Sequence, residues 1–220
     1  MINLNSQTPS YSANQSQTDI QFDKKKLRVS IRKQRRSLSK LEQKIASNNL
    51  IKQINQSKLL FRHQHIALYL GNDGELNPEI LIKKLWKQKK HVYLPVLHPF
   101  YKNTLCFCRI KPDSKYIKNR FAILEPDFKH SKSISKRFLS LVLMPLVAFD
   151  KSGNRMGMGG GFYDRSFSYK ANSKRCKPKL IGLAHAFQEQ NSLPLEKWDI
   201  PLEGVLTDKT SYQFRGITDD

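Results

Sequence analysis

Short apolar runs, separated by polar segments with helical spacing, recur along most of this 220-residue chain. The apolar runs predict strands at residues 65–70, 91–97, 105–110, 139–147, 179–185 and 204–207. Apolar spacing and capping residues predict helices at residues 23–37, from Lys40, from Asn77 to Lys90, and at 161–171. Because strands alternate with helices, the pattern predicts an α/β fold with a single open, mostly parallel sheet and helices on both faces.

Several helix starts are marked by particular residues. Ser39 and Glu42 have the spacing of a capping box, and Asn77 followed by Pro78 is a good N-cap and first turn. Residues 65–97 therefore form a βαβ-like unit. Residues 111–137 are polar and irregular, and only residues 121–124 are expected to pair with another strand there.

The two ends of the chain differ in composition. Residues 1–22 are rich in Asn, Gln, Ser and Thr, nearly uncharged and without apolar periodicity, so we expect a disordered extension. Residues 23–215 are long enough for one α/β domain with a sizeable core, and nothing in the pattern requires two.

The compartment can be inferred from segments that the chain lacks. No apolar run reaches the length of a membrane-spanning helix, and no basic region followed by an apolar one marks a secretory signal. The three cysteines suggest neither a disulfide framework nor a zinc site. We therefore expect a cytoplasmic protein that does not contact a membrane.

A formal net charge of +21 is the unusual feature of the composition. It is compatible with nucleic-acid binding, with a field that attracts polyanionic small molecules, or with solvated lysines that have no partner. Lys24, Arg28, Arg32 and Arg35, three or four residues apart, form one stripe along the first predicted helix. Such a stripe is most often a solvated face.

The largest cluster of candidate functional residues follows the strand at 139–147. The chain turns at residues 152–154, passes Arg155, runs through Gly157, Gly159, Gly160 and Gly161, and enters a helix at Phe162-Tyr163-Asp164-Arg165. A strand, a glycine loop and a helix N-terminus form a natural phosphate cradle, because backbone N–H groups can approach an anion there. The alternative is a turn that only needs positive φ angles. Neither the Walker loop nor GxGxxG fits the spacing.

This segment, from Met144 to Arg165, closely resembles the signature of the 5-formyltetrahydrofolate cyclo-ligase family, also called 5,10-methenyltetrahydrofolate synthetases. Blocks at residues 24–28 and 193–208 match in the same order, so the resemblance spans roughly residues 24–210. It implies an open α/β fold similar to the glucosamine-phosphate isomerase and ribose-phosphate isomerase group. It also implies that ATP phosphorylates the formyl oxygen of 5-formyltetrahydrofolate, that nitrogen 10 then closes the ring, and that Mg²⁺ is required.

The resemblance assigns a role to each matching residue. Those implied to bind ATP are Lys24, Arg28, Arg155, Gly157, Gly159, Gly160, Gly161 and Tyr163. Those implied to bind the folate are Leu70, Glu75, Met158 and Phe162, with Glu75 accepting hydrogen bonds from the pterin and Tyr163 also lining the pocket of its ring. Arg155 and Asp164 are the implied catalytic residues, and Asp164 and Asp199 the implied Mg²⁺ ligands. His185 is interpreted as a packed core histidine and is left out.

Two other functions are weighed against this one. The first is a diverged cyclo-ligase-like module that binds RNA through its basic surface, and the second is a sugar-phosphate isomerase on the same fold. The presence of Glu75, Arg155 and Asp164 favours the enzyme. We expect a monomer that binds ATP and 5-formyltetrahydrofolate, including polyglutamylated forms, and no specific nucleic acid.

Overall fold

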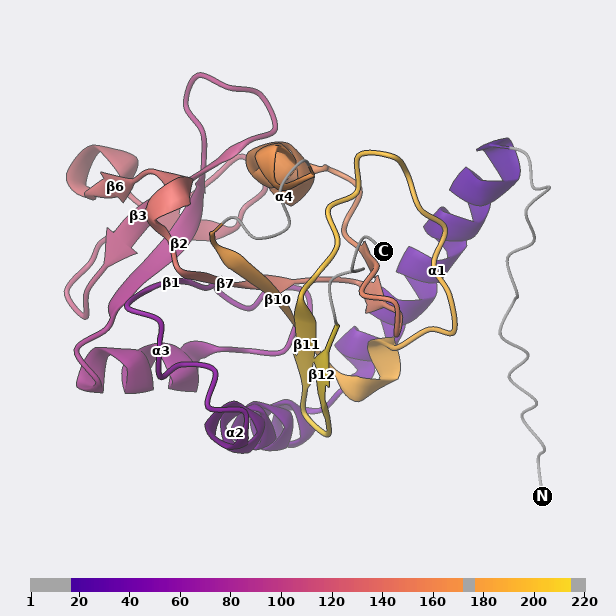
Figure 1. Cartoon of the computed structure of the whole chain (residues 1–220), viewed down its shortest axis with the longest axis horizontal. Coiled ribbons are helices and arrows are strands. Elements are labelled where there is room, and N and C mark those ends of the chain that lie inside the picture. Colours follow the sequence, from indigo (N-terminus) through magenta and orange to yellow (C-terminus); the bar gives the residue numbers. More distant parts are fainter. Residues whose placement is uncertain (1–16, 172–176, 215–220) are drawn as a thin grey trace, which may run out of the picture.

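A computed structural model describes residues 17–171 and 177–214 of the chain. Eight strands of these residues form one sheet in the order β12-β11-β10-β7-β1-β2-β3-β6 (Figure 1). In that order they are Ser211–Gln213, Gly204–Thr207, Lys179–Ala184, Leu141–Pro145, His65–Ala67, His91–Leu97, Leu105–Ile110 and Ser133–Ile134. The five strands from β11 to β2 are parallel, and the outer pairings β11–β12, β2–β3 and β3–β6 are antiparallel. The predicted open, mostly parallel α/β sheet is confirmed.

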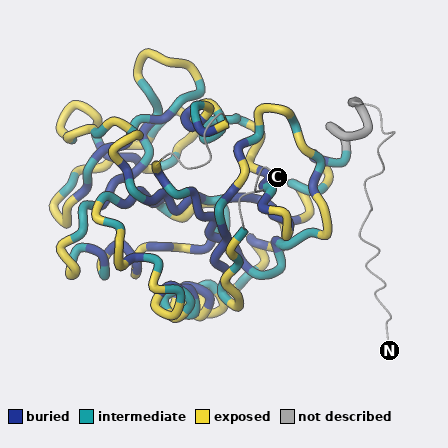
Figure 2. The backbone as a smooth tube through the Cα atoms, in the orientation of Figure 1, coloured by how far each residue is buried: buried dark blue, intermediate teal, exposed yellow. Residues whose placement is uncertain are grey.

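Helices cover both faces of the sheet. α2 (Lys40–Gln56) and α3 (Glu79–Lys87) lie on the lower face in Figure 1, and α4 (Phe162–Phe167) lies on the upper face. Strand β7 shows why both faces are needed: Leu141 and Leu143 belong to the core under α2 and α3, and Val142 and Met144 to the opposite core. The strands are accordingly buried while the connections are exposed (Figure 2).

The predicted helix starts are largely correct. Ser39 and Glu42 form the expected capping box of α2. The N-cap of α3 is Pro78 rather than the predicted Asn77, although the Asn77 side chain accepts a hydrogen bond from the Glu79 N–H at 2.9 Å. α3 ends at Lys87 rather than Lys90, because Lys89 adopts a left-handed φ of 56° that a helix cannot continue through.

Helix α1 (Gln17–Ser37) begins six residues before the predicted start at Asp23. Residues 17–22 therefore have helical backbone and are not part of a disordered extension, while residues 1–16 lie outside the described part. Low charge and missing periodicity do not prevent a helix when the segment directly extends one that is already formed, because propagation needs no new nucleus.

The strand before the glycine loop and the helix after it are shorter than predicted. The 139–147 strand stops at Pro145, and a small ribbon of β8 (Ala148–Phe149) and β9 (Arg155–Met156) follows it. α4 continues only as a 3₁₀ turn, η3 (Ser168–Lys170), and not as a helix to residue 171. Another 3₁₀ turn, η4 (Ala186–Gln188), follows β10.

Residues 111–137 hold more structure than the sequence indicated. β4 (Tyr116–Lys118) pairs with β5 (Leu124–Pro126), and 3₁₀ turns η1 (Phe128–His130) and η2 (Lys136–Phe138) flank β6. The prediction that residues 121–124 pair was wrong for all but Leu124. The Asn119 side chain accepts hydrogen bonds from the N–H groups of Phe121 and Ile123, which makes the segment a turn.

The order of the strands places two loops side by side. From β1 the chain moves outward to β2, but β7 returns to the other side of β1 and continues outward to β10. The loops after β1 and β7 therefore leave the carboxyl edge of the sheet in opposite directions at a topological switch point, which is where ligands bind in open α/β sheets and which we call the crevice. Within the described residues, we find no helix that is long and apolar enough to cross a membrane.

Candidate functional site

The glycine loop after β9 shows which of its glycines are required by geometry. Gly159 and Gly161 have positive φ angles of 96° and 65°. A Cβ on Gly160 would lie 2.6 Å from the Phe162 ring. A Cβ on Gly157 would meet nothing within 4 Å, and its φ is not positive. The turn alone thus explains three of these glycines, whereas Gly157 leaves backbone open to an approaching group.

Arg155 and Asp164 form a buried ion pair beside this loop. The Arg155 Nη2 lies 2.5 Å from the Asp164 Oδ1, and only 6% of the Arg155 side chain is exposed. Arg155 Nη1 also donates to the carbonyl of Ile200, and the Ile200 N–H donates to Asp164 Oδ1 at 3.2 Å. The pair therefore ties β9, α4 and the segment after residue 193 into one unit.

Arg28 of α1 faces the same loop, and Lys24 of α1 contacts the segment after residue 193. Arg28 Nε donates to the carbonyl of Gly157 at 2.9 Å, and its guanidinium passes 3.7 Å from the position of a Cβ on Gly159. Lys24 is buried and its Nζ lies 3.1 Å from Glu196 Oε1. The sequence placed Lys24 and Arg28 on one stripe with Arg32 and Arg35. In the structure, Arg32 and Arg35 instead contact Asp73.

Asp199 lies close to this cluster. Its Oδ2 accepts a hydrogen bond from the Glu196 N–H at 2.9 Å. Burial raises the pKa of Asp199, and the neighbouring carboxylate of Asp164 raises it further, while Lys24 opposes the shift. The two acids predicted to bind a metal are therefore near enough to repel each other. Neither here nor elsewhere do the described residues contain a group of three or more His, Cys, Asp or Glu side chains that could hold a metal ion.

Glu75 lies in the loop after β1, on the other side of the crevice. Burial raises its pKa to about 7, and Arg35 opposes that shift. The Glu75 carboxylate also contributes to the raised pKa of the Tyr69 and Tyr163 hydroxyls, both of which are mainly raised by burial. Glu75 and Tyr163 are thus neighbours, which brings the predicted folate ligand next to the start of α4.

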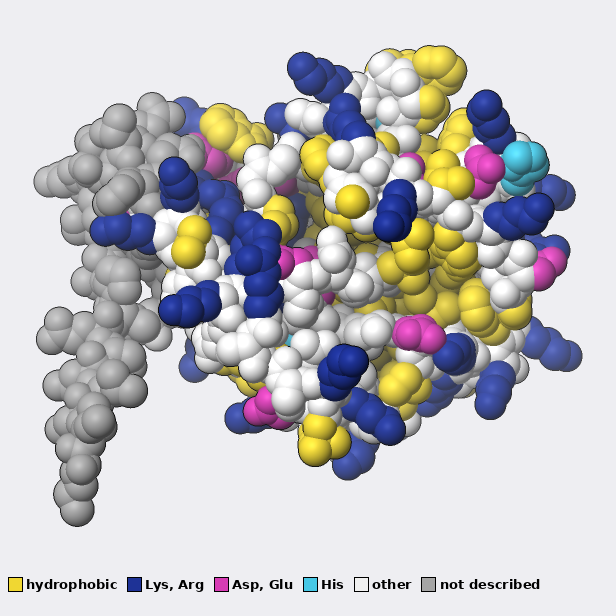
Figure 3. Space-filling view, turned by 180° about the vertical axis from the view of Figure 1, so that it is seen from behind, with side chains coloured by type: hydrophobic (Ala, Val, Ile, Leu, Met, Phe, Trp, Pro, Cys, Tyr) yellow, Lys and Arg dark blue, Asp and Glu magenta, His cyan; other side chains and the backbone are white. Residues whose placement is uncertain are grey.

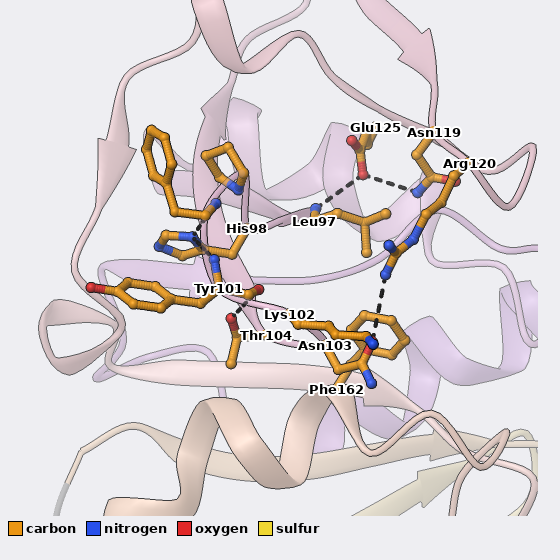
Figure 4. A pocket seen from close by; sticks show the side chains of 12 residues that line it. Leu97, His98, Tyr101, Lys102, Asn103, Thr104, Asn119, Arg120, Glu125 and Phe162 are labelled. Carbon is orange, nitrogen blue, oxygen red and sulfur yellow. Dashed lines mark hydrogen bonds between the residues drawn. The ribbon is translucent and has the colours of Figure 1, made fainter.

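Phe162 forms one wall of a pocket of about 400 Å³ (Figure 4). The other walls come from the connection between β2 and β3, residues 97–104, and from the hairpin of β4 and β5. The rings of Phe162 and Phe121 meet edge to face, with centroids 5.8 Å apart. Glu125 is buried at one end and accepts from the N–H of Leu97 and the side chain of Asn119.

The remaining folate candidates are less enclosed. Leu70 is partly buried and packs against the core under α2 and α3, whereas half of Met158 is exposed at the tip of the glycine loop. The structure thus brings Glu75 and Tyr163 together and gives Phe162 a pocket, but it leaves Met158 open to solvent.

Comparison with known proteins gives a consistent result. A family model described as the 5-formyltetrahydrofolate cyclo-ligase family matches residues 20–208. A 5-formyltetrahydrofolate cyclo-ligase of Haemophilus influenzae is 42% identical over 183 residues, 83% of this chain and 96% of that protein. The chain belongs to the 5-formyltetrahydrofolate cyclo-ligase family. The expectation of an enzyme of this family is confirmed.

Other relatives agree with this cyclo-ligase family membership. The Escherichia coli K12 protein of the same name is 39% identical over 178 residues, 80% of this chain and 96% of that protein. The NMR structure of Aquifex aeolicus 5,10-methenyltetrahydrofolate synthetase is 28% identical, with a TM-score of 0.73 over 88% of this chain and 93% of that one. The fold of the family is therefore present over nearly the whole described chain.

Sequence reasoning missed a set of arginine contacts at the same crevice. Arg32, Arg35 and Arg36 all bind the carboxylate of Asp73, two residues before Glu75. The available signal was the spacing of the basic residues, which was interpreted as a solvated face. His185 is buried and its Nε2 lies 3.1 Å from the carbonyl oxygen of Gly74, so its interpretation as a packed core histidine is confirmed.

Proposed function

We propose that this cyclo-ligase family enzyme converts 5-formyltetrahydrofolate to 5,10-methenyltetrahydrofolate, with cleavage of ATP to ADP and phosphate. The observation that carries the proposal is the meeting of a glycine loop, Arg155 and two cations of α1 beside a pair of carboxylates. This cluster faces Glu75 across the crevice between the loops after β1 and β7.

The cations and amides of the loop suit a polyphosphate. Arg28 already lies along Gly157 and Gly159, and Lys24 lies one helical turn away on α1. Phosphoryl transfer needs positioning and charge neutralisation more than a protein nucleophile. In the proposal, the amides of residues 157–161, Lys24 and Arg28 hold the phosphates, and Arg155 neutralises charge on the transferred group.

The donor set at this point fits Mg²⁺. Asp164 and Asp199 supply hard carboxylate oxygens, and their mutual repulsion is the kind that a bound divalent cation relieves. The hydrogen bonds of Asp164 to described residues use Oδ1, so Oδ2 is the oxygen it can offer. When bound, Mg²⁺ would neutralise phosphate charge. Arg155 holds the Asp164 carboxylate in place for that role.

The folate is proposed to lie between Glu75 and Phe162. The Glu75 carboxylate accepts hydrogen bonds from pterin N–H groups, and Leu70, Met158, Phe162 and Tyr163 contact the ring. The remainder of the molecule extends past Phe162 into the 400 Å³ pocket. This orientation directs the formyl oxygen toward the glycine loop, because Tyr163 lies close to Glu75 at the end of that loop.

The reaction then proceeds in two steps. The formyl oxygen attacks the terminal phosphorus of ATP, the bond to ADP breaks, and the oxygen becomes part of a good leaving group. Nitrogen 10 attacks the activated formyl carbon and loses its proton, and the carbon–oxygen bond breaks to release phosphate. The methenyl bridge remains between nitrogens 5 and 10.

Cyclisation is therefore expected to require both ATP and a divalent cation. Purified protein is mixed with 5-formyltetrahydrofolate, and growth of the methenyltetrahydrofolate absorbance is followed with and without each component. Removal of the cation with a chelator should abolish turnover, and added Mg²⁺ should restore it. Product formation without any nucleotide would contradict the proposal.

Replacement of both Lys24 and Arg28 by alanine is expected to raise the KM for ATP by tenfold or more, and to change the KM for monoglutamyl folate far less. Each charge that contacts a phosphate contributes about 1.5–3 kcal/mol. A matched control is the double change Lys33→Ala and Lys40→Ala, which removes two exposed charges nearby. An equal rise of both KM values would show that these cations do not serve ATP.

The basic surface gives little support to an RNA-binding function. On the face shown in Figure 3, Lys and Arg side chains are spread widely and interrupted by neutral and hydrophobic surface. Any RNA binding should accordingly be insensitive to sequence and lost steeply as salt rises, because it would rest on phosphate contacts alone. Filter binding over a salt series, run beside the absorbance assay, separates the two functions.

A further inference from the structure

Three arginines of α1 converge on one carboxylate at the edge of the crevice. Arg32 Nε and Arg35 Nη2 each lie 2.7 Å from Asp73 Oδ2, and Arg36 Nε donates to Asp73 Oδ1. We call these four residues the arginine clamp. Three cations on a single acid exceed what is needed to neutralise it, so the clamp leaves positive charge close to the next acid along the chain, Glu75.

The clamp fixes the turn that presents Glu75. Asp73 and Gly74 have positive φ angles of 53° and 71°, and the Glu75 N–H closes the turn on the carbonyl of Asn72 at 2.9 Å. The three arginine contacts fix the Asp73 side chain at this left-handed position of the turn. A Cβ on Gly74 would lie 2.6 Å from the carbonyl oxygen of Arg35, so the turn rests directly on α1.

Arg35 is the buried arginine of the clamp. Its side chain is completely buried, and its Nη1 donates to the carbonyl of Leu146 at 3.3 Å and lies 3.9 Å from Glu75 Oε1. Its buried Nε has no hydrogen-bond partner among the described residues. A permanently charged group that is buried with an unsatisfied donor is costly, and a functional role is one of the reasons for which proteins retain such a group. Arg35 thus joins both loops of the crevice at a point next to Glu75.

Several charged or titratable groups face Glu75 from the surrounding elements. They are Arg32 and Arg35 of α1, Asp73 of its own turn, Tyr69 after β1 and Tyr163 of α4, while His185 after β10 contacts the carbonyl of the preceding Gly74. Arg35 and Arg32 favour the carboxylate, whereas burial and the charge of Asp73 favour the neutral acid. The two halves of the clamp therefore act on Glu75 in opposite directions.

We propose that Arg35 and Asp73 are positioning residues that set the orientation and the charge of the Glu75 carboxylate for pterin binding, an inference that rests on the proposed function. Removing the positive half of the clamp should favour neutral Glu75, and removing its negative half should favour the carboxylate. A purely structural role does not produce shifts of opposite sign.

The test is a ¹³C NMR titration of the glutamate side-chain carboxyls, with the Glu75 signal assigned by its loss in Glu75→Gln. Arg35→Gln should raise the pKa of Glu75 by one unit or more, and Asp73→Asn should lower it by half a unit or more. Lys33→Gln removes one exposed charge from the same helix and should leave the value unchanged. Circular dichroism melts verify that each variant is folded.

Turnover gives the second readout. If the pKa of Glu75 rises by one unit from about 7, the ionised fraction of Glu75 at pH 7 falls from about a half to about a tenth. We therefore expect kcat/KM of Arg35→Gln to be about fivefold lower than that of the wild type at pH 7. The loss should be recovered at higher pH, which a displaced turn would not permit.

The outcomes separate the two proposals. If the wild-type protein forms no product, the proposed function fails, and the titration still tests the clamp. If Arg35→Gln does not fold, the downward shift in Asp73→Asn decides. A Glu75 pKa within about 0.3 unit of wild type in every folded clamp variant would overturn the inference.

Discussion

Replacement of Arg155 by alanine is expected to lower kcat/KM by at least about a hundredfold, because one preorganised charge on a transferring phosphoryl group contributes roughly 3 kcal/mol or more. The same change should lower the free energy of unfolding by about 3 kcal/mol. The reason is that Arg155 is buried against Asp164 and the carbonyl of Ile200, and its removal leaves the Asp164 carboxylate unpaired. Steady-state kinetics and denaturant unfolding measure the two effects.

Two comparisons keep this Arg155 experiment interpretable. Lys151→Ala removes an exposed cation in the same connection, which reaches Glu189 only at 3.6 Å, and should leave both quantities nearly unchanged. Arg155→Lys retains the charge but not the two-pronged contact with Asp164 and Ile200, so it should restore only part of the activity. An unchanged rate in a well-folded Arg155→Ala protein would show that the loop does not neutralise phosphate.

Glu75→Gln is expected to abolish most turnover while making the protein more stable at alkaline pH. The native Glu75 holds its proton up to about pH 7, whereas the unfolded side chain releases it near 4.5. Between these values the native state binds more protons, so the free energy of unfolding of the wild type falls as pH rises. The fall is on the order of 3 kcal/mol and is complete above about pH 7. A neutral glutamine does not show this loss.

Thermal melts of both proteins from pH 5 to 8.5 measure this difference. The melting temperature of Glu75→Gln should exceed that of the wild type by a margin that increases from pH 5 to about 7 and then stays constant. Glu79→Gln, which alters an exposed carboxylate paired with Lys83, serves as the control and should show no such divergence. A margin that stays constant across this range would mean that Glu75 is not buried as a neutral acid.

The elements that were predicted correctly are those that the local sequence pattern determines. Apolar runs located the sheet strands other than β6 and β12, and the capping box at Ser39 was correct because a cap depends on residues two or three positions away. The expected N-cap at Asn77 was wrong, because Pro78 is the N-cap of α3 and no side chain caps that helix. The hairpin of β4 and β5 was missed, since its segments are short and polar and depend on the side chain of Asn119. Its pairing could not be found from apolar alternation.

The residues of the candidate site were also predicted where they are contiguous in sequence or matched by the family resemblance, and missed where neither applies. The glycine loop and its neighbour Arg155 are contiguous in sequence, and the family resemblance joined them to Lys24 and Arg28. The structure places Arg28 beside the loop and Lys24 against Glu196. The arginine clamp links residues about forty positions apart, so spacing along α1 alone could not reveal its partner Asp73. The roles proposed for these residues in ATP and folate binding remain predictions.

The most direct test of the proposed chemistry follows the formyl oxygen. The purified protein is given ATP, Mg²⁺ and 5-formyltetrahydrofolate that carries ¹⁸O in the formyl group, and the phosphate released is analysed by ³¹P NMR or mass spectrometry. If the formyl oxygen is phosphorylated before ring closure, each molecule of phosphate should contain one ¹⁸O atom. Formation of the methenyl product together with unlabelled phosphate would contradict the account.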